Sequence, residues 1–185
     1  NHQYSNTDTK DLWESLEESS NDPVEKTMES WIYQPGFPKI KVTEDNNSIK
    51  LEQSIFKYEN RSNKNQLWKI PVVIKSISKS NESTFKTLIQ DDNKIIKLDN
   101  SPNIFHLVNV AGDGFYRVQY SNNLLTKILK NLNPEKNKIS NIERFCLLDD
   151  FWSLIISCNK TVDNFLENLQ FFKEENDPEV LNLII

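Results

Sequence analysis

The sequence predicts an α+β protein in which an antiparallel β-sandwich of about seven strands is flanked by α-helices on both sides. Three observations carry this prediction. Apolar residues recur at helical spacing up to about residue 36 and again after residue 120. Between these stretches apolar and polar residues alternate, and turn-forming residues divide the alternating stretch into short runs. We therefore divide the chain into residues 1–36, 37–120 and 121–185.

The first segment is predicted to contain two helices. Thr9 is expected to cap the first one. Asp22-Pro23-Val24-Glu25 is typical of a second helix start, with Asp22 as the cap, Pro23 in the first turn and Glu25 reaching back to the cap. The expected apolar positions of the two helices are Leu12, Trp13, Leu16, Val24, Met28, Trp31 and Ile32.

The middle segment is predicted to be rich in strands. A first strand is expected over 37–42, and the strict alternation from Ile49 to Ile55 indicates a half-buried strand. Pro71 falls in the extended run 67–77, where proline is tolerated at a sheet edge or a bulge. Two hairpins are predicted, one joining 85–89 to 95–98 and the other joining 104–110 to 115–120.

The last predicted strand makes a specific claim about side-chain direction. Successive strand residues point to opposite faces, so Phe115 and Arg117 should share one face, and Tyr116 and Val118 the other. We expect Tyr116 and Val118 to face the core, because arginine is rarely buried without a partner. Burial of Arg117 in a salt-bridged site would make it a candidate functional residue.

The third segment returns to helical spacing. Ser140 and Glu143 form a predicted capping box, Thr161 is expected to cap a further helix, and Asp177-Pro178 to open the last one. We expect this segment to be truncated, because the chain stops at two isoleucines. The predicted apolar positions are Leu124, Leu125, Ile128, Leu129, Leu132, Phe145, Leu148, Phe151, Trp152, Ile155, Val162, Phe165, Leu166 and Leu169.

Two further expectations concern apolar side chains. We expect the four tryptophans, Trp13, Trp31, Trp68 and Trp152, to be mostly buried. We also expect apolar surface to be exposed at both ends of the chain, with contributions from Leu12, Met28, Leu181 and Ile184.

Composition excludes several classes of function. The 185 residues carry 22 basic and 27 acidic side chains, a net charge of −5, which argues against a nucleic-acid-binding protein. With three glycines, the sequence has no phosphate-binding loop. Its apolar runs are too short for a membrane-spanning helix, and Cys146 and Cys158 are expected to be free thiols, which favours a reducing, cytoplasmic location.

Residues that could carry chemistry are few and scattered. The two histidines, His2 and His106, lack partners at zinc-ligand spacing, and His106 is expected to be a core residue of a strand. Asp91-Asp92 suits a turn, and Asp149-Asp150 should not converge, since helix neighbours point about 100° apart. We therefore predict no catalytic, cofactor-binding or metal-binding residue in this chain.

Six stretches of the sequence, taken in order, form a recognisable series. They are Asp11-Leu12-Trp13, Met28-Glu29-Ser30-Trp31, Gln34-Pro35-Gly36-Phe37-Pro38, Leu67-Trp68-Lys69-Ile70-Pro71-Val72, Gly114-Phe115-Tyr116-Arg117-Val118-Gln119-Tyr120 and Arg144-Phe145-Cys146-Leu147-Leu148-Asp149-Asp150. This series resembles one known family, the gluzincin zinc aminopeptidases of the aminopeptidase N and puromycin-sensitive type. The resemblance covers nearly all of the chain and follows the region after the family's zinc site. Gln119 replaces the asparagine that is usual in the family's Gly-Phe-Tyr-Arg-Val motif.

The resemblance implies the end of a catalytic domain (1–36), a β-sandwich domain (37–120) and the first helices of a C-terminal helical domain (121–185). It implies a parent enzyme that uses zinc to remove N-terminal residues from peptides. The family's zinc-binding and amine-binding motifs are absent here. The chain alone is therefore expected to be inactive, with the parent's catalytic domain and its remaining helices as partners. A stand-alone β-sandwich interaction module is the alternative interpretation, and an independent hydrolase is disfavoured.

Overall fold

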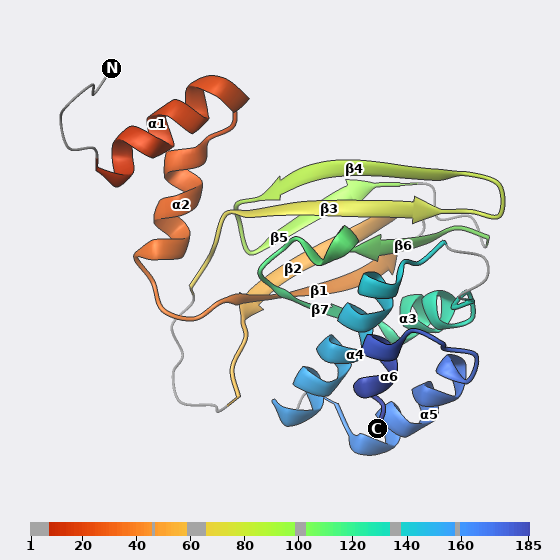
Figure 1. Ribbon diagram of the computed structural model, residues 1–185. Coiled ribbons are helices and arrows are strands. Elements are labelled where there is room, and N and C mark those ends of the chain that lie inside the picture. The colour runs from red at the N-terminus through yellow and green to blue at the C-terminus, as the bar shows by residue number, and fades with distance from the viewer. Residues whose placement is uncertain (1–7, 46, 59–65, 99–102, 134–137, 158–159) are drawn as a thin grey trace.

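The computed structural model describes residues 8–45, 47–58, 66–98, 103–133, 138–157 and 160–185. Two helices come first, seven strands follow, and four helices complete the chain (Figure 1). The strands are β1 (Pro38–Asp45), β2 (Ser48–Ile55), β3 (Ile70–Ile77), β4 (Glu82–Ile89), β5 (Asn93–Lys97), β6 (Phe105–Val108) and β7 (Arg117–Tyr120). The helices are α1 (Thr9–Ser20), α2 (Val24–Ile32), α3 (Asn122–Leu129), α4 (Asn141–Ile156), α5 (Val162–Leu169) and α6 (Pro178–Asn182), with short 3-10 turns η1 (Val110–Gly112) and η3 (Gln170–Phe172).

The strands form two sheets, which confirms the predicted α+β class. One sheet has four strands in the order β5-β2-β1-β7, and the other has three in the order β4-β3-β6. Pairing is antiparallel except between β1 and β7, which run parallel with Ile40 opposite Val118. This one pair departs from the antiparallel pairing predicted for the sandwich, because the chain returns to β1 after passing through the other sheet.

Neither predicted hairpin forms, because the chain changes sheets at both turns. At the first turn β4 stays paired with β3 while β5 joins β2 in the other sheet. Gln53 of β2 holds this crossing in place. Its backbone N–H donates to the carbonyl of Asp92 at 2.9 Å, and its side-chain amide donates to the carbonyl of Asp91 at 2.7 Å. The pair Asp91-Asp92 thus forms a corner between sheets.

At the second turn β6 pairs with β3, and β7 pairs with β1. Asn109 and Ala111 adopt left-handed backbone angles, with φ of 67° and 59°, and this turns the chain out of one sheet and into the other. The Tyr120 hydroxyl then ties the two edge strands together. It accepts from the Val108 N–H at 2.8 Å and donates to the Val108 carbonyl at 3.1 Å.

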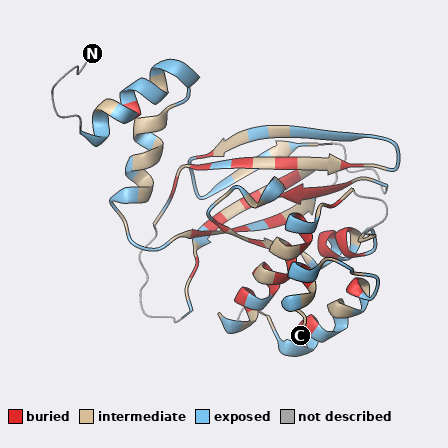
Figure 2. Ribbon diagram, viewed as in Figure 1, coloured by how far each residue is buried: buried red, intermediate tan, exposed pale blue. Residues whose placement is uncertain are grey.

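A single hydrophobic core fills the space between the sheets and extends under α3 (Figure 2). Ile49, Leu51 and Gln53 alternate inward along β2 as the sequence predicted. Pro71 occupies an edge-like position although β3 is the middle strand. Its neighbour β6 pairs only with Ile74–Ile77, so within the described residues the β6 side of Pro71 has no strand that requires the N–H it lacks.

Three of the five predicted caps are confirmed. Ser140 and Glu143 form a capping box, and Thr161 accepts from the Asn164 N–H. Asp177, just before Pro178, accepts from the N–H groups of Glu179 and Val180. The two caps predicted for the N-terminal helices were wrong. The carboxylate of Asp8 caps α1, with Thr9 as its first helical residue, and α2 begins after Pro23 without a side-chain cap.

The tryptophans divide by location. Trp13 and Trp68 are buried, with 3% and 0% exposed, whereas Trp31 is half-buried. The prediction for Trp152 was wrong, because α4 turns this ring outward and 47% of the residue is exposed. Its ring lies against Phe165 of α5, at a centroid distance of 5.6 Å.

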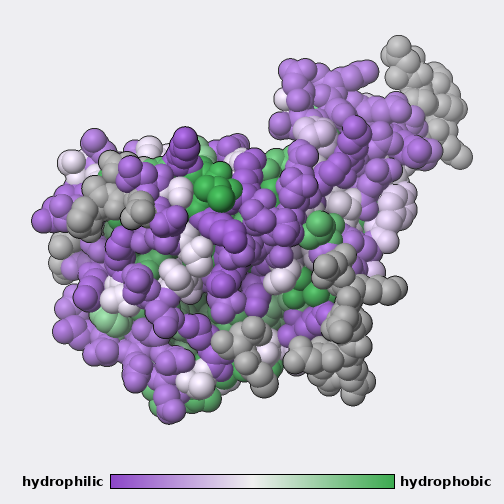
Figure 3. Space-filling model, turned by 180° about the vertical axis from the view of Figure 1, so that it is seen from behind, coloured by the Kyte–Doolittle hydropathy of each residue, from purple (hydrophilic) through white to green (hydrophobic). Residues whose placement is uncertain are grey.

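Exposed apolar residues lie in several places. Of the four residues predicted to contribute, Leu12 is exposed at 58%, and Met28, Leu181 and Ile184 are half-buried. The face seen in Figure 3 is mainly hydrophilic, with apolar residues in small separate groups. Among the described residues, no helix combines the length and apolar character that a membrane span requires.

Candidate functional site

The C-terminal helices contact the sandwich along its β6–β7 side, and a cluster of charges lies at this contact. Arg117 extends from β7 toward α4, where its Nη1 donates to Asp149 Oδ2 and, at 3.3 Å, to Asp150 Oδ1. The prediction that the two carboxylates do not converge was therefore wrong. Asp149 and Asp150 leave the helix in different directions, but both accept a hydrogen bond from the same guanidinium.

Asp150 is the buried member of this cluster, with 7% of the residue exposed. Its Oδ2 accepts from the backbone N–H of Val118 at 3.0 Å, so it joins α4 to the main chain of β7. Burial raises the pKa of the Asp150 carboxyl to about 7, against the opposing effects of Arg117 and the Val118 N–H. Asp150 therefore changes charge near neutral pH.

Two other ion pairs, one largely buried and one partly buried, cross the same contact. Lys75 of β3 donates to Glu143 of α4 at 2.7 Å, and Lys127 of α3 donates to Glu44 of β1 at 2.7 Å. The side chain of Glu143 is 2% exposed and also accepts from the Ser140 N–H, so one carboxylate caps α4 and fixes it to the sheet. The sandwich thus contributes three charged side chains that bind the helices, namely Glu44, Lys75 and Arg117.

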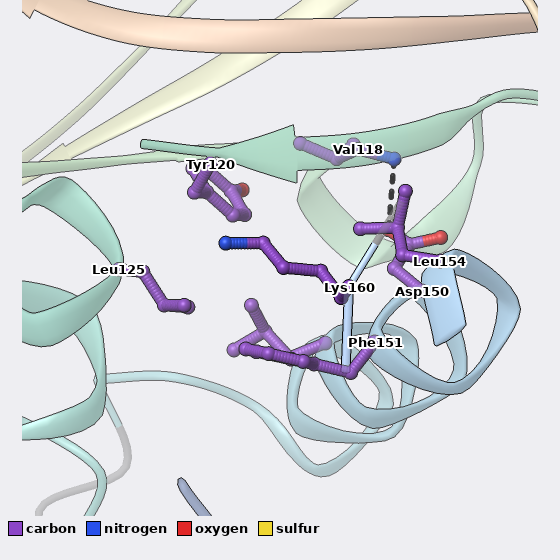
Figure 4. Close-up of a pocket in the computed structure, with 8 residues that line it drawn as sticks. Val118, Tyr120, Leu125, Asp150, Phe151, Leu154 and Lys160 are labelled. Atoms are coloured by element: carbon purple, nitrogen blue, oxygen red, sulfur yellow. Dashed lines mark hydrogen bonds between the residues drawn. The ribbon is translucent and has the colours of Figure 1, made fainter. Parts of the chain in front are cut away.

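A small space lies on the far side of the Val118–Asp150 hydrogen bond (Figure 4). Lys160 extends into it between Tyr120 and Phe151, and its Nζ donates to the side-chain oxygen of Asn122 at 2.8 Å. The open volume is about 10 Å³, close to the minimum for one water molecule. This space is too small for an organic ligand.

A larger cavity, of about 230 Å³, is lined by Arg117 and shares Asp150 with the small space. Most of its lining comes from the turn after β6, the start of β7 and α4. Burial raises the pKa of the Cys146 thiol, which lines this cavity, to about 11. The thiol is therefore protonated at neutral pH and is a poor nucleophile. The cavity is lined by Phe37, Asn109, Gly112, Gly114, Phe115, Tyr116, Arg117, Cys146, Asp149 and Asp150.

The remaining residues considered from sequence are not brought together. His106 is fully buried in β6 and its Nδ1 lies 2.9 Å from Ser76 Oγ of β3, which confirms the prediction of a core histidine. His2 and Cys158 lie outside the described residues. Within the described ranges, no three His, Cys, Asp or Glu side chains are grouped to hold a metal ion. The residues described thus do not fit a zinc centre.

Sequence reasoning identified Arg117 but missed its partners. Tyr116 and Val118 face the core as predicted, with 6% and 3% exposed, while Phe115 is 72% exposed. The Arg117 side chain is 24% exposed, so it lies within a salt-bridged site. One signal could have found these partners. Arg117 lies on the outer face of β7, and an arginine that a helix covers requires a carboxylate partner. Asp149 and Asp150 are the adjacent acidic residues of α4, the helix that covers β7.

Comparison with known proteins finds a domain family that contains the contact between the sandwich and the C-terminal helices. Residues 105–185, which include β6, β7, the charge cluster and the four C-terminal helices, match the model of the ERAP1-like C-terminal domain. The boundary of that match lies inside the sandwich, at the start of β6.

Similarity to individual proteins extends over the whole chain. It is 31% identical to Tricorn protease-interacting factor F2 of Thermoplasma volcanium, with 99% of this chain and 21% of the relative covered. It is 33% identical to aminopeptidase M1-C of Oryza sativa subsp. japonica, with 98% and 21% covered. It is 28% identical to the puromycin-sensitive aminopeptidase of Caenorhabditis elegans, with 89% and 18% covered.

These relatives confirm the resemblance seen in the sequence motifs. The chain belongs to the M1 aminopeptidase family, and it spans about a fifth of the length of the curated relatives that it matches.

Proposed function

We propose that this chain is a non-catalytic, structural segment of a zinc-dependent aminopeptidase that removes N-terminal residues from peptides. The observation that carries the proposal is similarity along the full chain to about a fifth of each aminopeptidase relative. The described residues supply no group that fits a metal centre, so the parent's chemistry is assigned to a part outside this segment.

In this proposal the sandwich acts as a spacer between the catalytic domain and the helical domain, and it is firmly attached to the helical domain. Residues 1–36 belong to the end of the catalytic domain, 37–120 form the sandwich, and 121–185 begin the helical domain. The ion pairs of Arg117, Lys75 and Lys127 support this role, because they fix the angle between sandwich and helices. A fixed angle would position the helical domain relative to the catalytic domain.

The partners in this proposal are the parent's catalytic domain and its further C-terminal helices. Zinc is proposed as a cofactor of the parent and not of this segment, and a cytoplasmic location is proposed from the two cysteines expected to be free. The exposed apolar side chains of α1, Leu12 and Leu16, support a partner surface on the N-terminal helices.

Two measurements on the purified 185-residue chain test the proposal. Metal analysis after dialysis should find zinc well below one equivalent, because catalytic zinc requires three protein ligands that converge. An aminoacyl-amide assay with added zinc should give no turnover above buffer. A longer gene that encodes a His-Glu-x-x-His motif upstream of Asn1 would be expected alongside these results.

Stoichiometric zinc, or peptide cleavage that a chelator abolishes, would contradict the proposal. The variants His106→Gln and His2→Ala would then identify the ligands. A gene that encodes no further domain would instead favour the stand-alone interaction module.

A further inference from the structure

The cavity beside Arg117 has two chemically different walls. One is aromatic, formed by Phe37 and Phe115, whose ring centroids lie 5.3 Å apart. The other is polar, formed by Arg117 and Asp149, whose side chains are 24% and 36% exposed. Solvent therefore reaches both walls, and the volume of about 230 Å³ admits an apolar side chain together with its peptide group.

The guanidinium of Arg117 has unused donors. A guanidinium carries five N–H groups, and both ion pairs of Arg117 use Nη1. Within the described part of the chain, Nε and Nη2 donate to no residue. These two atoms form the planar fork with which arginine grips an acceptor. The charge of the guanidinium is already balanced by Asp149 and Asp150, so the fork suits a neutral acceptor such as a carbonyl oxygen.

The aromatic wall is held in place by a strained turn. Asn109 and Ala111 have left-handed φ angles, and Asn109 binds Gly114 through both its side-chain oxygen and its side-chain nitrogen. A Cβ at Gly114 would lie 2.1 Å from the Tyr116 ring, so no larger residue fits there. This turn fixes Phe115 with 72% of the residue exposed. Strain that holds a large aromatic side chain in solvent is typical of a binding surface.

We propose that this cavity binds a segment of peptide main chain that carries an apolar side chain. The Arg117 fork donates to a carbonyl oxygen of the segment, and the apolar side chain packs against Phe37 and Phe115. Asp149, next to the fork, accepts an N–H from the same segment. This inference is independent of the proposed function, since it concerns a site that the chain itself contains.

The experiment is a titration of the ¹⁵N-labelled chain with acetyl-leucyl-leucinamide, a capped peptide without charge, followed by NMR. The chain has three arginines, Arg61, Arg117 and Arg144, so its arginine Nε–H signals are few and assignable. We expect the Arg117 Nε–H signal and the Phe115 amide to shift in a saturable manner. Acetate, titrated separately, should leave them unchanged, because it offers a charged acceptor and no apolar side chain.

Variants make the result specific. Arg117→Lys keeps the positive charge but loses the fork, and it should weaken binding by about 5-fold, the equivalent of one hydrogen bond. Phe115→Ala removes an exposed ring and should weaken binding to a similar extent while the fold persists. The control is Ile95→Ala, which truncates an exposed apolar residue, 64% exposed, on β5 and should change nothing.

Three outcomes would overturn the proposal. The first is the absence of any saturable shift at Arg117 with the capped peptide. The second is equal binding by the wild type and Phe115→Ala. The third is binding of acetate as tight as that of the peptide, which would make the cavity an anion site.

Discussion

The two helical segments attach to the same pair of sheets through different kinds of contact. At the C-terminal side, α3 buries four apolar side chains in the core of the sandwich, and ion pairs from β1, β3 and β7 surround this contact. The buried residues of α3 are Leu124, Leu125, Ile128 and Leu129. This side of the molecule combines apolar burial with directional charge contacts.

At the N-terminal side, hydrogen bonds accompany the packing of one half-buried ring, that of Trp31, against the core. The Trp31 indole N–H donates to the Lys69 carbonyl at 2.9 Å, Ser30 Oγ accepts from the Lys69 N–H at 2.9 Å, and the Gln34 amide donates to the Leu67 carbonyl at 2.9 Å. No residue of α2 is buried, and α1 buries Trp13. Figure 1 shows these two helices standing apart from the body of the molecule.

The difference indicates two levels of stability in one chain. Apolar burial contributes about 25 cal/mol per Å², whereas an exposed hydrogen bond adds on the order of 1 kcal/mol or less. The sandwich with α3–α6 should therefore unfold as one cooperative unit, and α1–α2 should open separately at lower cost. The following predictions test this difference, from the largest expected effect to the smallest.

Glu143→Ala should produce the largest loss of stability. It removes the buried carboxylate that both pairs with Lys75 and caps α4, and it leaves a mostly buried ammonium with the Lys138 carbonyl as its described partner. Breaking one partner of a buried pair costs about 3–5 kcal/mol. Urea unfolding followed by circular dichroism measures this. Glu14→Ala, at an exposed position of α1, is the matched control and should cost less than about 0.5 kcal/mol.

Ile128→Ala tests the apolar part of the same contact. Ile128 is fully buried in the core that α3 shares with the sheets, so its truncation should cost about 2–5 kcal/mol. Amide exchange should accelerate in the sheets and in α3–α6 together. Accelerated exchange confined to α3 would show that the helices and the sandwich are not one cooperative unit. Leu16→Ala, at 46% exposure on α1, is the control.

The raised pKa of Asp150 predicts that the stability of the folded chain depends on pH. The pKa of its carboxyl is about 7 in the folded chain against 3.8 for the exposed group, so the folded state binds the proton more tightly. The stability from this group is fully present below about pH 4 and is lost as the pH rises through 7, by up to about 4 kcal/mol. The measurement is urea unfolding between pH 5 and pH 8.

Asp150→Asn provides the contrast. An asparagine can still accept from the Val118 N–H, and Asp149 remains to pair with Arg117. The variant should therefore gain stability relative to wild type at pH 8 and lose the slope between pH 5 and pH 8. An unchanged slope in the variant would mean that another group carries the pH dependence.

Sequence patterns predicted the elements better than their connections. The alternation along Ile49–Ile55 and the capping box at Ser140 could be predicted, because both depend on residues that are close together in the chain. The two sheet crossings were missed because a turn looks the same whether the next strand pairs with the previous one or with a distant one. At the first crossing, the contacts that hold the corner come from Gln53, about 40 residues earlier in the chain.

In the candidate site, too, the features set by local geometry were predicted and those set by tertiary packing were missed. The directions of Tyr116 and Arg117 follow from strand geometry and were predicted correctly. The convergence of Asp149 and Asp150 depends on where α4 crosses β7, which is a tertiary property. The exposure of Trp152 was missed for a related reason. Apolar residues occur around most of α4, so helical spacing did not reveal which face is buried.

The smallest effect is expected at the N-terminal contact, where Trp31→Phe removes one hydrogen bond. The phenyl ring keeps an aromatic contact with Trp68 and Phe115, but the Lys69 carbonyl loses its indole donor. Since Lys69 is half-buried, we expect water to replace the donor and the cost to be about 1 kcal/mol. The cost should fall on the opening of α1–α2, so that native-state amide exchange there accelerates about 5-fold while exchange in β1–β3 does not change.

Trp152→Phe is the matched control for this variant, because it makes the same substitution on the exposed face of α4. It should leave exchange in α1–α2 at the wild-type rate. Equal acceleration of α1–α2 and the sheets in Trp31→Phe would show that the N-terminal helices unfold together with the sandwich. In that case hydrogen bonds from three side chains would couple the helices as firmly as the buried face of α3 does, and the proposed difference between the two contacts would be wrong.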